Sequence, residues 1–528
     1  MDPKPPESAD RPTPTRQSAL SAQREPYVPP GHVLDQVDGR VLDPGTALAV
    51  KGVRPRSTVY VGPRLLVSRS DATATRVAQL QAVAESLGWL ATVHPGDEAH
   101  VTDEQDDTRL GVVRLDLTVL DEKATIAPDG WVLLQNARAT HGLEAMSRVG
   151  LDHIVLVRGI DPNPFHGSNP FHGSNPAGGQ ASAAVSSYAI AGWGGRQPIG
   201  YAGPQPVRRP DDQLVGRRPV VATVDTGCGK HPWLAAVVTP GPGLDGQPIG
   251  YVDDESDPEK WFDQVGPLDG GIDALSGHGT FIAGLIHQAC PDADIVAWRV
   301  VGSDGPVVES DLVAALADIA EVARRHRDGQ EGGHPIDVLS LSMGYYHETP
   351  QDQLFDPTMY DILRRLGECG VSVVCSAGND ATARPMFPAA FAPWADGAGG
   401  VPPEDTVVPI MSVGALNPNG TDALFSNAGP WVRAHAPGAA VMSTMPEFQG
   451  GLEPAARTEA YGRRRESLDP DDYTSGFALW SGTSFAAPLF AGQVAEQIVD
   501  GIDPDDDGRP PAVARAWKAL SALTDLAP

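Results

Sequence analysis

Residues 220–227 have the sequence VVATVDTG, a run of β-branched and small apolar residues that ends in a carboxylate and a glycine turn. Such a run is typical of a strand that is buried on both faces. Similar apolar runs occupy residues 295–301, 338–342, 371–376 and 408–413, with helix-length amphipathic segments at 311–325 and 359–366. Strands that alternate with helices predict an α/β fold: a doubly wound, mostly parallel sheet with helices on both faces. Functional groups in such sheets lie at the carboxyl ends of the strands.

An earlier part of the chain, residues 57–160, has a different pattern. Apolar alternation and helical spacing predict the order strand, helix, strand, strand, helix, strand. The predicted elements lie at residues 58–67, 74–87, 89–93, 110–119, 131–148 and 153–157. This order is that of the split βαβ, ferredoxin-like arrangement. The sequence therefore predicts a small α+β, ferredoxin-like domain that precedes the larger α/β domain.

Two segments with little periodicity flank the small domain. Residues 1–56 are rich in proline and polar groups, which predicts a mostly disordered tail. Residues 161–215 are rich in Gly, Pro, Ser and Asn, and they contain the hexapeptide NPFHGS twice, at 163–168 and 169–174. Because two copies of six residues are too few for a repeat fold, we interpret this segment as a linker. A peptide that a binding partner recognises is the alternative interpretation.

The composition excludes several function classes. The 528 residues include 39 Lys and Arg against 68 Asp and Glu, a net charge of −29. We therefore expect no nucleic-acid binding and no docking on anionic lipid as the main task. We find no signal-like apolar stretch near the start and no run of 18 apolar residues, so we expect neither secretion by the usual route nor a membrane span. The four scattered cysteines favour reduced thiols in a cytoplasm.

Four short motifs carry reactive side chains at predicted strand ends and helix starts. Asp225 ends the strand quoted above, His278 lies between two glycines at the start of an apolar helix, Asn379 follows a buried strand, and Ser484 opens a helix. Each motif alone has a structural interpretation, such as a turn or a helix N-cap. Together they match a serine nucleophile, its base, the partner that orients the base, and an amide donor for an oxyanion.

The motifs identify a family. DTG at residues 225–227, HGTFIAG at 278–284 and GTSFAAP at 482–488, in the order Asp, His, Ser, resemble the subtilisin-like serine proteases, or subtilases. The segment SAGN at 376–379 matches the position of that family's oxyanion asparagine. The resemblance implies a subtilisin-like catalytic domain over residues 216–528. It also implies hydrolysis of peptide bonds through an acyl-enzyme, with protein or peptide substrates and no cofactor in the chemistry.

The resemblance further implies a set of substrate-binding residues. One strand, Ser342 to Gly344, is expected to pair with an extended peptide beside the S1 pocket. Met386 takes a position where many relatives have glycine, which implies a shallower S1 pocket. The full expected set is Ser342, Met343, Gly344, Ala377, Gly378, Met386 and Thr483.

The small domain resembles, in topology, the prodomains of many subtilases. We therefore expect residues 57–160 to cover the cleft as in a zymogen, and the linker 161–215 to be cut by Ser484 itself. Two other interpretations stay open. The small domain could recruit a regulatory partner protein, or the chain could be a catalytically silent scaffold.

Three motifs for other chemistry are incomplete. Asp-Thr-Gly is also the aspartic-protease signature, but the chain lacks the second copy which that chemistry needs. The sequence around Gly229 and Lys230 lacks the first glycine of a phosphate loop. Residues 503–508 begin like a calcium loop, but its twelfth position is Ala514 instead of a glutamate. We therefore expect no metal in the chemistry, and the sequence does not indicate structural calcium.

Overall fold

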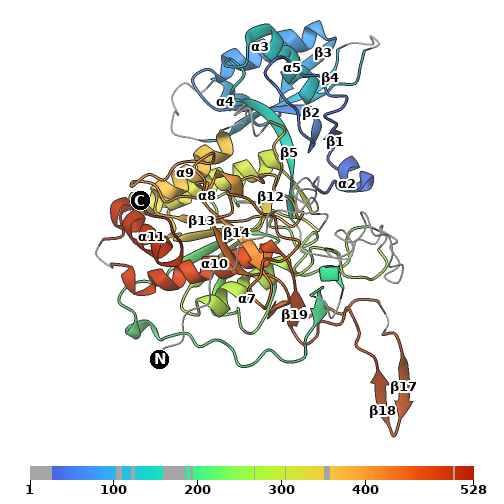
Figure 1. The fold of residues 1–528 in the computed structure, drawn as a ribbon, viewed down its shortest axis with the longest axis vertical. Coiled ribbons are helices and arrows are strands. Elements are labelled where there is room, and N and C mark those ends of the chain that lie inside the picture. Colours follow the sequence, from blue (N-terminus) through green and yellow to red (C-terminus); the bar gives the residue numbers. More distant parts are fainter. Residues whose placement is uncertain are drawn as a thin grey trace, which may run out of the picture.

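The computed structural model describes residues 26–102, 110–120, 125–157, 185, 187–190, 194–266, 268–303, 305–349, 357–452, 454–503 and 506–528. The duplicated NPFHGS hexapeptide lies outside these residues. The described chain forms a smaller α+β unit, at the top of Figure 1, and a larger α/β unit below it.

The larger unit is built on a sheet of seven strands. In spatial order these are β15 (Ala434–Pro437), β14 (Met411–Leu416), β13 (Ser372–Ser376), β11 (Val338–Leu341), β7 (Val220–Asp225), β9 (Asp294–Arg299) and β8 (Val238–Pro240). Every neighbouring pair in this sheet is parallel. The predicted parallel sheet is therefore confirmed, and the VVATVD run forms β7 near its middle.

Helices cover both faces of this sheet. The helices α7 (His278–Ala289), α10 (Thr483–Ile498) and α11 (Arg509–Leu523) share a core with one face, and α8 (Glu309–Arg327) and α9 (Thr358–Glu368) share a core with the other. Successive side chains of a strand point to opposite faces. Along β7, Val221 accordingly joins the first core, and Val220 and Ala222 join the second. Among the described helices, none combines the length and the apolar character that a membrane crossing requires.

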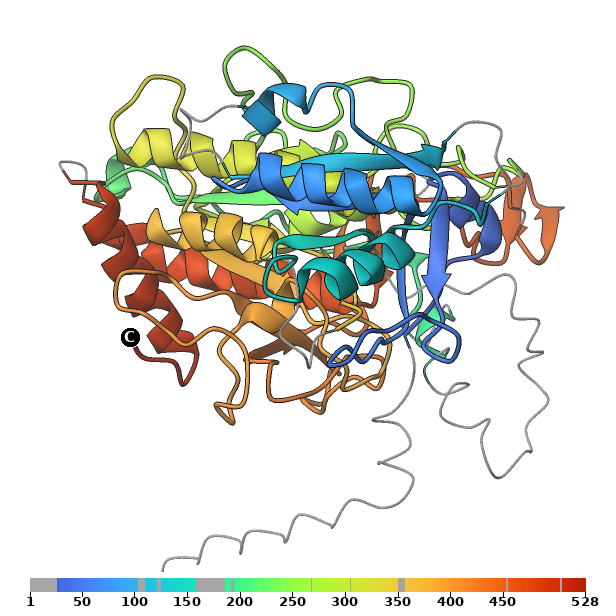
Figure 2. The ribbon, with the colours of Figure 1, turned by 90° about the horizontal axis from the view of Figure 1, so that it is seen from above.

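The smaller unit has the predicted ferredoxin-like arrangement. Its strands lie in the order β5 (Val149–Val157), β2 (Thr58–Ser68), β4 (Val112–Val119) and β3 (Trp89–Val93), and all are antiparallel. The helices α3 (Thr73–Ser86) and α5 (Gly130–His141) pack on the outer face of this sheet, as seen from above in Figure 2. The second helix is shorter than the predicted 131–148, because Gly142 adopts a left-handed φ of 91° and ends it.

The tail and the linker contain more structure than the sequence indicated. Residues 31–35 form α2 (Gly31–Asp35), and β1 (Gly39–Leu42) pairs with β2, so the expectation of a disordered 1–56 is wrong for residues 31–42. Within the expected linker 161–215, β6 (Gln197–Pro198) pairs with β19 (Phe477–Trp480), and Arg209 forms an ion pair with Asp292 at 2.6 Å. These short contacts, with the smaller unit for β1 and with the larger unit for β6 and Arg209, leave no periodic signal in the sequence.

The described chain also contains a short α-helix and several short strands, besides short 3₁₀ segments. The helix and the strands are α4 (Glu98–Thr102), β10 (Pro306–Val308), β12 (Met343–Gly344), β16 (Val441–Thr444), β17 (Arg457–Ala460) and β18 (Arg463–Glu466). The last two form a hairpin that projects from the body of the protein in Figure 1 and carries the basic run at residues 463–465. This exposed hairpin lengthens the segment between β16 and the motif around Ser484.

A buried carboxylate, Asp337, stabilises the amino end of the parallel sheet. It accepts hydrogen bonds from Arg217 Nη1 at 2.6 Å, from Arg327 Nη2 at 3.0 Å and from the backbone N–H of Val220 at 2.9 Å. Burial alone would raise the pKa of Asp337, but the charges and hydrogen bonds of these partners outweigh it and hold the pKa well below its usual range. Asp507, from the calcium-like segment, pairs with the same two arginines.

We expect Asp337→Ala to lower the free energy of unfolding by about 3–5 kcal/mol, because the buried guanidinium of Arg327 and the half-buried guanidinium of Arg217 then share Asp507 as their remaining counter-charge. Asp328→Ala is the control: this exposed carboxylate pairs with Arg324 and Arg509 at the surface, where a pair contributes about 0–1 kcal/mol. Urea unfolding measures both variants. Since folding lowers the pKa of Asp337, the wild-type contribution is present above about pH 4 and is lost as the pH falls below it. Equal losses in the two variants would contradict this role.

Candidate active site

The four motif side chains lie at the carboxyl edge of the parallel sheet. Asp225 is the last residue of β7, His278 is the first of α7, Ser484 lies in the first turn of α10, and Asn379 follows the end of β13. All four are buried. Because the carboxyl ends of parallel strands meet at one edge, the sheet brings together groups that are far apart in the sequence. Gly277, with a φ of 83°, turns the chain into α7.

The carboxylate of Asp225 orients the ring of His278. Its Oδ1 lies 2.7 Å from His278 Nδ1, and it also accepts a hydrogen bond from the backbone N–H of Thr226 at 2.8 Å. A hydrogen bond from Nδ1 to a carboxylate fixes the tautomer in which Nε2 can accept a proton. Within the described part of the chain, His278 Nε2 is buried and has no hydrogen-bond partner.

Ser484 precedes a residue that contacts this pair. The ring of the next residue, Phe485, packs against the His278 imidazole with 5.3 Å between centroids. Ser484 Oγ donates to the carbonyl oxygen of Ser342 at 3.4 Å, and Ser342 Oγ donates to the carbonyl oxygen of Ser484 at 2.9 Å. Catalytic hydrogen bonds are often long in unliganded sites and tighten when a substrate binds. The arrangement is therefore compatible with proton transfer from Ser484 to His278.

The side-chain amide of Asn379 is fixed by Thr483. Asn379 Oδ1 accepts hydrogen bonds from the backbone N–H and from the hydroxyl of Thr483, both at 2.8 Å. This pairing identifies Nδ2 as the donor end of the amide. A Cβ atom built on Gly482 would lie 3.6 Å from Nδ2, so Nδ2 faces the chain just before Ser484. Donors at this place can stabilise an oxyanion.

Most of the expected substrate-binding residues surround one small hollow. Six of the seven line it together with Asn379 and Ser484, namely Ser342, Met343, Gly344, Gly378, Met386 and Thr483. The seventh, Ala377, is fully buried and does not line it. The hollow has a volume of about 20 Å³, room for roughly one water molecule. Met386 fills the space between Gly344 and Gly378, since a Cβ on either glycine would lie 2.7 Å from its side chain.

The sequence did not indicate which strand of the smaller unit pairs with this edge. The last residues of β5 pair antiparallel with β10 on one side and with β12 on the other. Val157 lies opposite Met343, and Leu156 lies opposite Gly344 and lines the hollow. Figure 1 shows β5 running from the smaller unit into the larger one. The end of β5 therefore extends along the segment that we expected to bind substrate.

Glu259, which no sequence motif marks, contacts the neighbours of both Asp225 and His278. Its carboxylate accepts hydrogen bonds from the backbone N–H of Gly279 at 2.8 Å and from the hydroxyls of Thr226 and Thr280. Burial, only partly offset by these hydrogen bonds, raises the pKa of Glu259 to about 7. Glu259 thus connects the residue after Asp225 to the residues after His278. It lies in a loop without a motif, so no sequence signal pointed to it.

The chain is similar to known proteins in sequence. The sequence model of the Subtilase family matches residues 216–501. An intracellular serine protease of Paenibacillus polymyxa is 25% identical over 299 residues, which are 54% of this chain and 68% of that protein. An extracellular protease of Xanthomonas campestris pv. campestris is 25% identical over 318 residues, 56% of this chain and 46% of that protein. The chain thus spans about half to two thirds of the length of these relatives.

Two solved structures are also similar. Fervidolysin from Fervidobacterium pennivorans, a keratinolytic enzyme related to subtilisin, has a TM-score of 0.43 and 19% identity, covering 87% of this chain and 58% of that chain. A lanthipeptide protease has a TM-score of 0.35 and 22% identity, covering 55% of this chain and 75% of that chain.

The family match extends over more than half of the chain and contains Asp225, His278, Asn379 and Ser484. The chain therefore belongs to the subtilase family of serine proteases.

Proposed function

We propose that this chain is a serine endopeptidase that hydrolyses peptide bonds through an acyl-enzyme. Ser484 is the nucleophile, His278 is the general base and then the general acid, and Asp225 orients the imidazole. The observation that carries the proposal is the 2.7 Å contact between Asp225 and His278, at the sheet edge that also holds Ser484 and Asn379.

In the proposed reaction, the edges of β10 and β12 bind the substrate peptide. An extended peptide adds a strand between β10 and β12, so that backbone hydrogen bonds hold it next to Ser484. His278 Nε2 takes the hydroxyl proton as Ser484 Oγ bonds to the carbonyl carbon, and it gives that proton to the leaving amine as the C–N bond breaks. Asn379 Nδ2 and the Ser484 N–H donate to the oxyanion. A water molecule then releases the acid by the reverse steps.

The side chain of Met386 limits the proposed S1 pocket. Because it fills the space between Gly344 and Gly378, the enclosed part of the pocket is shallow. A long substrate side chain can enter only where Met386 moves aside.

Covalent labelling by a fluorophosphonate probe tests the nucleophile. We expect an adduct on Ser484 in the wild type and none in Ser484→Ala, because only an activated hydroxyl reacts with this probe. Peptide hydrolysis is expected to fall about 10⁶-fold in Ser484→Ala, a typical loss when the nucleophile of such a triad is removed. Ser475→Ala, an exposed serine before the same helix, is the control and should keep both activities. A wild type without adduct, intact and after limited proteolysis of the smaller unit, would support the silent-scaffold alternative.

We also propose that the smaller unit covers the site until the enzyme cleaves its own chain. Residues Ile154–Val157 of β5 fill the gap between β10 and β12, where the proposed substrate strand binds. In an antiparallel pair, the residue numbers rise along one strand while those of the opposite residues fall along the other. Val157 lies opposite Met343, the residue after Ser342, and Ser342 contacts Ser484. The proposed cleavage site is therefore the first peptide bonds after Val157, at or just before the linker 161–215 in which we expected the cut.

Mass spectrometry of the purified chain tests this self-processing. We expect the wild type to be cut within a few residues after Val157, and Ser484→Ala to stay intact. Mapping of the new termini identifies the bond. A wild type that stays uncut while it hydrolyses peptides at full rate would refute the proposal that the smaller unit covers the site. It would favour the alternative in which the smaller unit recruits a regulatory partner.

Glu259 is proposed as a positioning residue. It contacts the residue after Asp225 and the residues after His278, and it contacts neither member of the pair directly. We expect Glu259→Gln to lower kcat by about 10- to 100-fold with KM nearly unchanged, because the pair shifts while the peptide-binding strands do not. Because the pKa of Glu259 is about 7, its replacement by a group that does not titrate should also change the acid limb of the kcat/KM profile.

The control for this variant is Glu255→Gln, an exposed glutamate in the same loop, which should change neither quantity. Rates measured between pH 5 and 10 give both readouts. A Glu259→Gln enzyme with wild-type kcat and an unshifted pH profile would show that Glu259 has only a structural role.

The cytoplasm is the proposed location. This proposal rests on the four cysteines, all of which are unpaired in the structure. One relative is named an intracellular protease and another an extracellular protease, so cell fractionation is the deciding measurement.

A further inference from the structure

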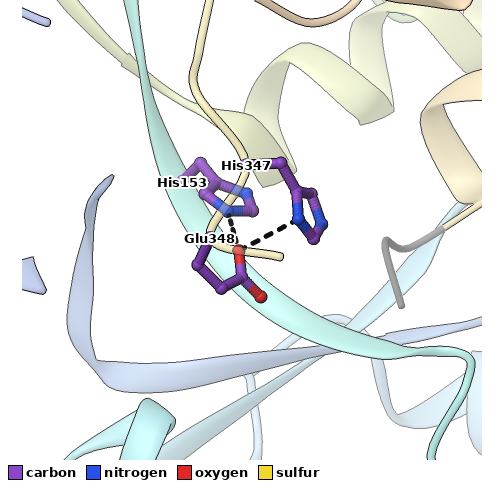
Figure 3. Close-up of side chains that lie close together, drawn as sticks. All are labelled: His153, His347 and Glu348. Atoms are coloured by element: carbon purple, nitrogen blue, oxygen red, sulfur yellow. Dashed lines mark hydrogen bonds and ion pairs between the residues drawn. The ribbon is translucent and has the colours of Figure 1, made fainter. Parts of the chain in front are cut away.

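A buried cluster of two imidazoles and two carboxylates lies where the smaller unit meets the larger one. His153 belongs to β5, His347 and Glu348 follow β12, and Glu309 begins α8. Figure 3 shows the rings of His153 and His347 on two sides of Glu348, with a nitrogen of each directed at the same carboxylate oxygen. The proposed catalytic steps use none of these side chains.

The distances in the cluster suit a single bound ion. Glu348 Oε2 lies 2.8 Å from His153 Nε2 and 3.4 Å from His347 Nδ1. One donor atom from each of the three residues lies within 4.8 Å of the others. Ligands around a tetrahedral zinc ion are separated by roughly 3.3 Å, because each bond is about 2.0–2.1 Å long. Small side-chain rotations would therefore bring the three donors onto one ion.

The surroundings of His153 have the form usual around a metal-bound histidine. Its second ring nitrogen, Nδ1, lies 2.5 Å from Glu309 Oε2. A carboxylate at this position fixes the ring and increases the basicity of the nitrogen that faces the ion. The ring of Tyr345 stacks on the imidazole with 4.6 Å between centroids, which holds its plane. Nε2 of His153 is therefore held in place facing Glu348.

One oxygen of Glu348 lacks a hydrogen bond to any residue that the structure describes. Glu348 is fully buried, and its Oε1 has no hydrogen-bond partner among the described residues. A buried carboxylate oxygen without a partner costs free energy, which a cation bound at this carboxylate would recover. This observation is independent of the spacing of the three donors, and it points to the same ligand.

We propose that His153, His347 and Glu348 bind one divalent transition-metal ion of the Zn²⁺ type. Imidazole nitrogen and carboxylate oxygen form a donor set that zinc accepts, whereas Ca²⁺ and Mg²⁺ take mainly oxygen ligands. Since His153 comes from the smaller unit and the other two ligands come from the larger one, the ion would join the two units. Loss of the ion would loosen the end of β5 from the cleft.

Zinc binding by the full chain carrying Ser484→Ala tests the site without self-cleavage. After incubation with Zn²⁺ and gel filtration, elemental analysis is expected to find one zinc ion per chain. His153→Ala and His347→Ala should each weaken Zn²⁺ binding at least 100-fold, and Glu309→Gln should weaken it about 10- to 100-fold through its hydrogen bond to His153. His435→Ala, an exposed histidine outside the cluster, is the control and should bind as the parent does.

Thermal unfolding gives a second readout, which does not depend on proteolysis. Zn²⁺ should raise the melting temperature of the parent and of His435→Ala, and should leave that of His153→Ala unchanged. A chain that binds no Zn²⁺ at micromolar concentration would overturn the proposal, and so would binding that persists in the His153 and His347 variants. The cluster would then be an ion pair in which protonated His153 bridges two glutamates. Either outcome leaves the labelling test of Ser484 unaffected.

Discussion

The hydrogen bond between Asp225 Oδ1 and His278 Nδ1 joins the last residue of a central strand to the first residue of a helix. Both side chains are buried, so water does not compete for the contact, and the low local dielectric strengthens it. The contact requires that β7 end at Asp225 and that α7 begin with His278 next to that strand end. Gly277 makes the second condition possible, because its left-handed conformation turns the chain at the helix start. Glu259 then fixes the residues that follow each partner.

Part of this arrangement could be predicted from the sequence, because local residue patterns determine it. The buried strands, the two faces of helices and the four motifs at strand ends and helix starts all follow from periodicity and turn chemistry. The match of β7 to the run at 220–225 is an example. Contacts that depend on packing left no such signal. The pairing of β5 with β10 and β12 involves only two or three residues on each partner. Glu259 lies in an irregular loop, and its role comes only from what surrounds it.

The two units share more than a contact surface. Backbone pairing continues from β3 through β4, β2 and β5 to the short strands β10 and β12 of the larger unit. If β5 left, these two short strands would each expose unpaired backbone groups at an edge. Binding of an extended peptide in its place would satisfy them again. The larger unit therefore presents the same backbone requirement to its own chain as to an incoming peptide.

The alternation of side chains along β5 has a consequence for how its length can vary. Its odd-numbered residues lie on one face: Val149 and Leu151 join the core of the smaller unit, His153 belongs to the buried cluster, and Val155 and Val157 join the core of the larger unit. Insertion or deletion of a single residue within the strand would move every later side chain to the opposite face. The strand thus works as a spacer whose length can change only in steps of two residues, unless a β-bulge absorbs the odd one.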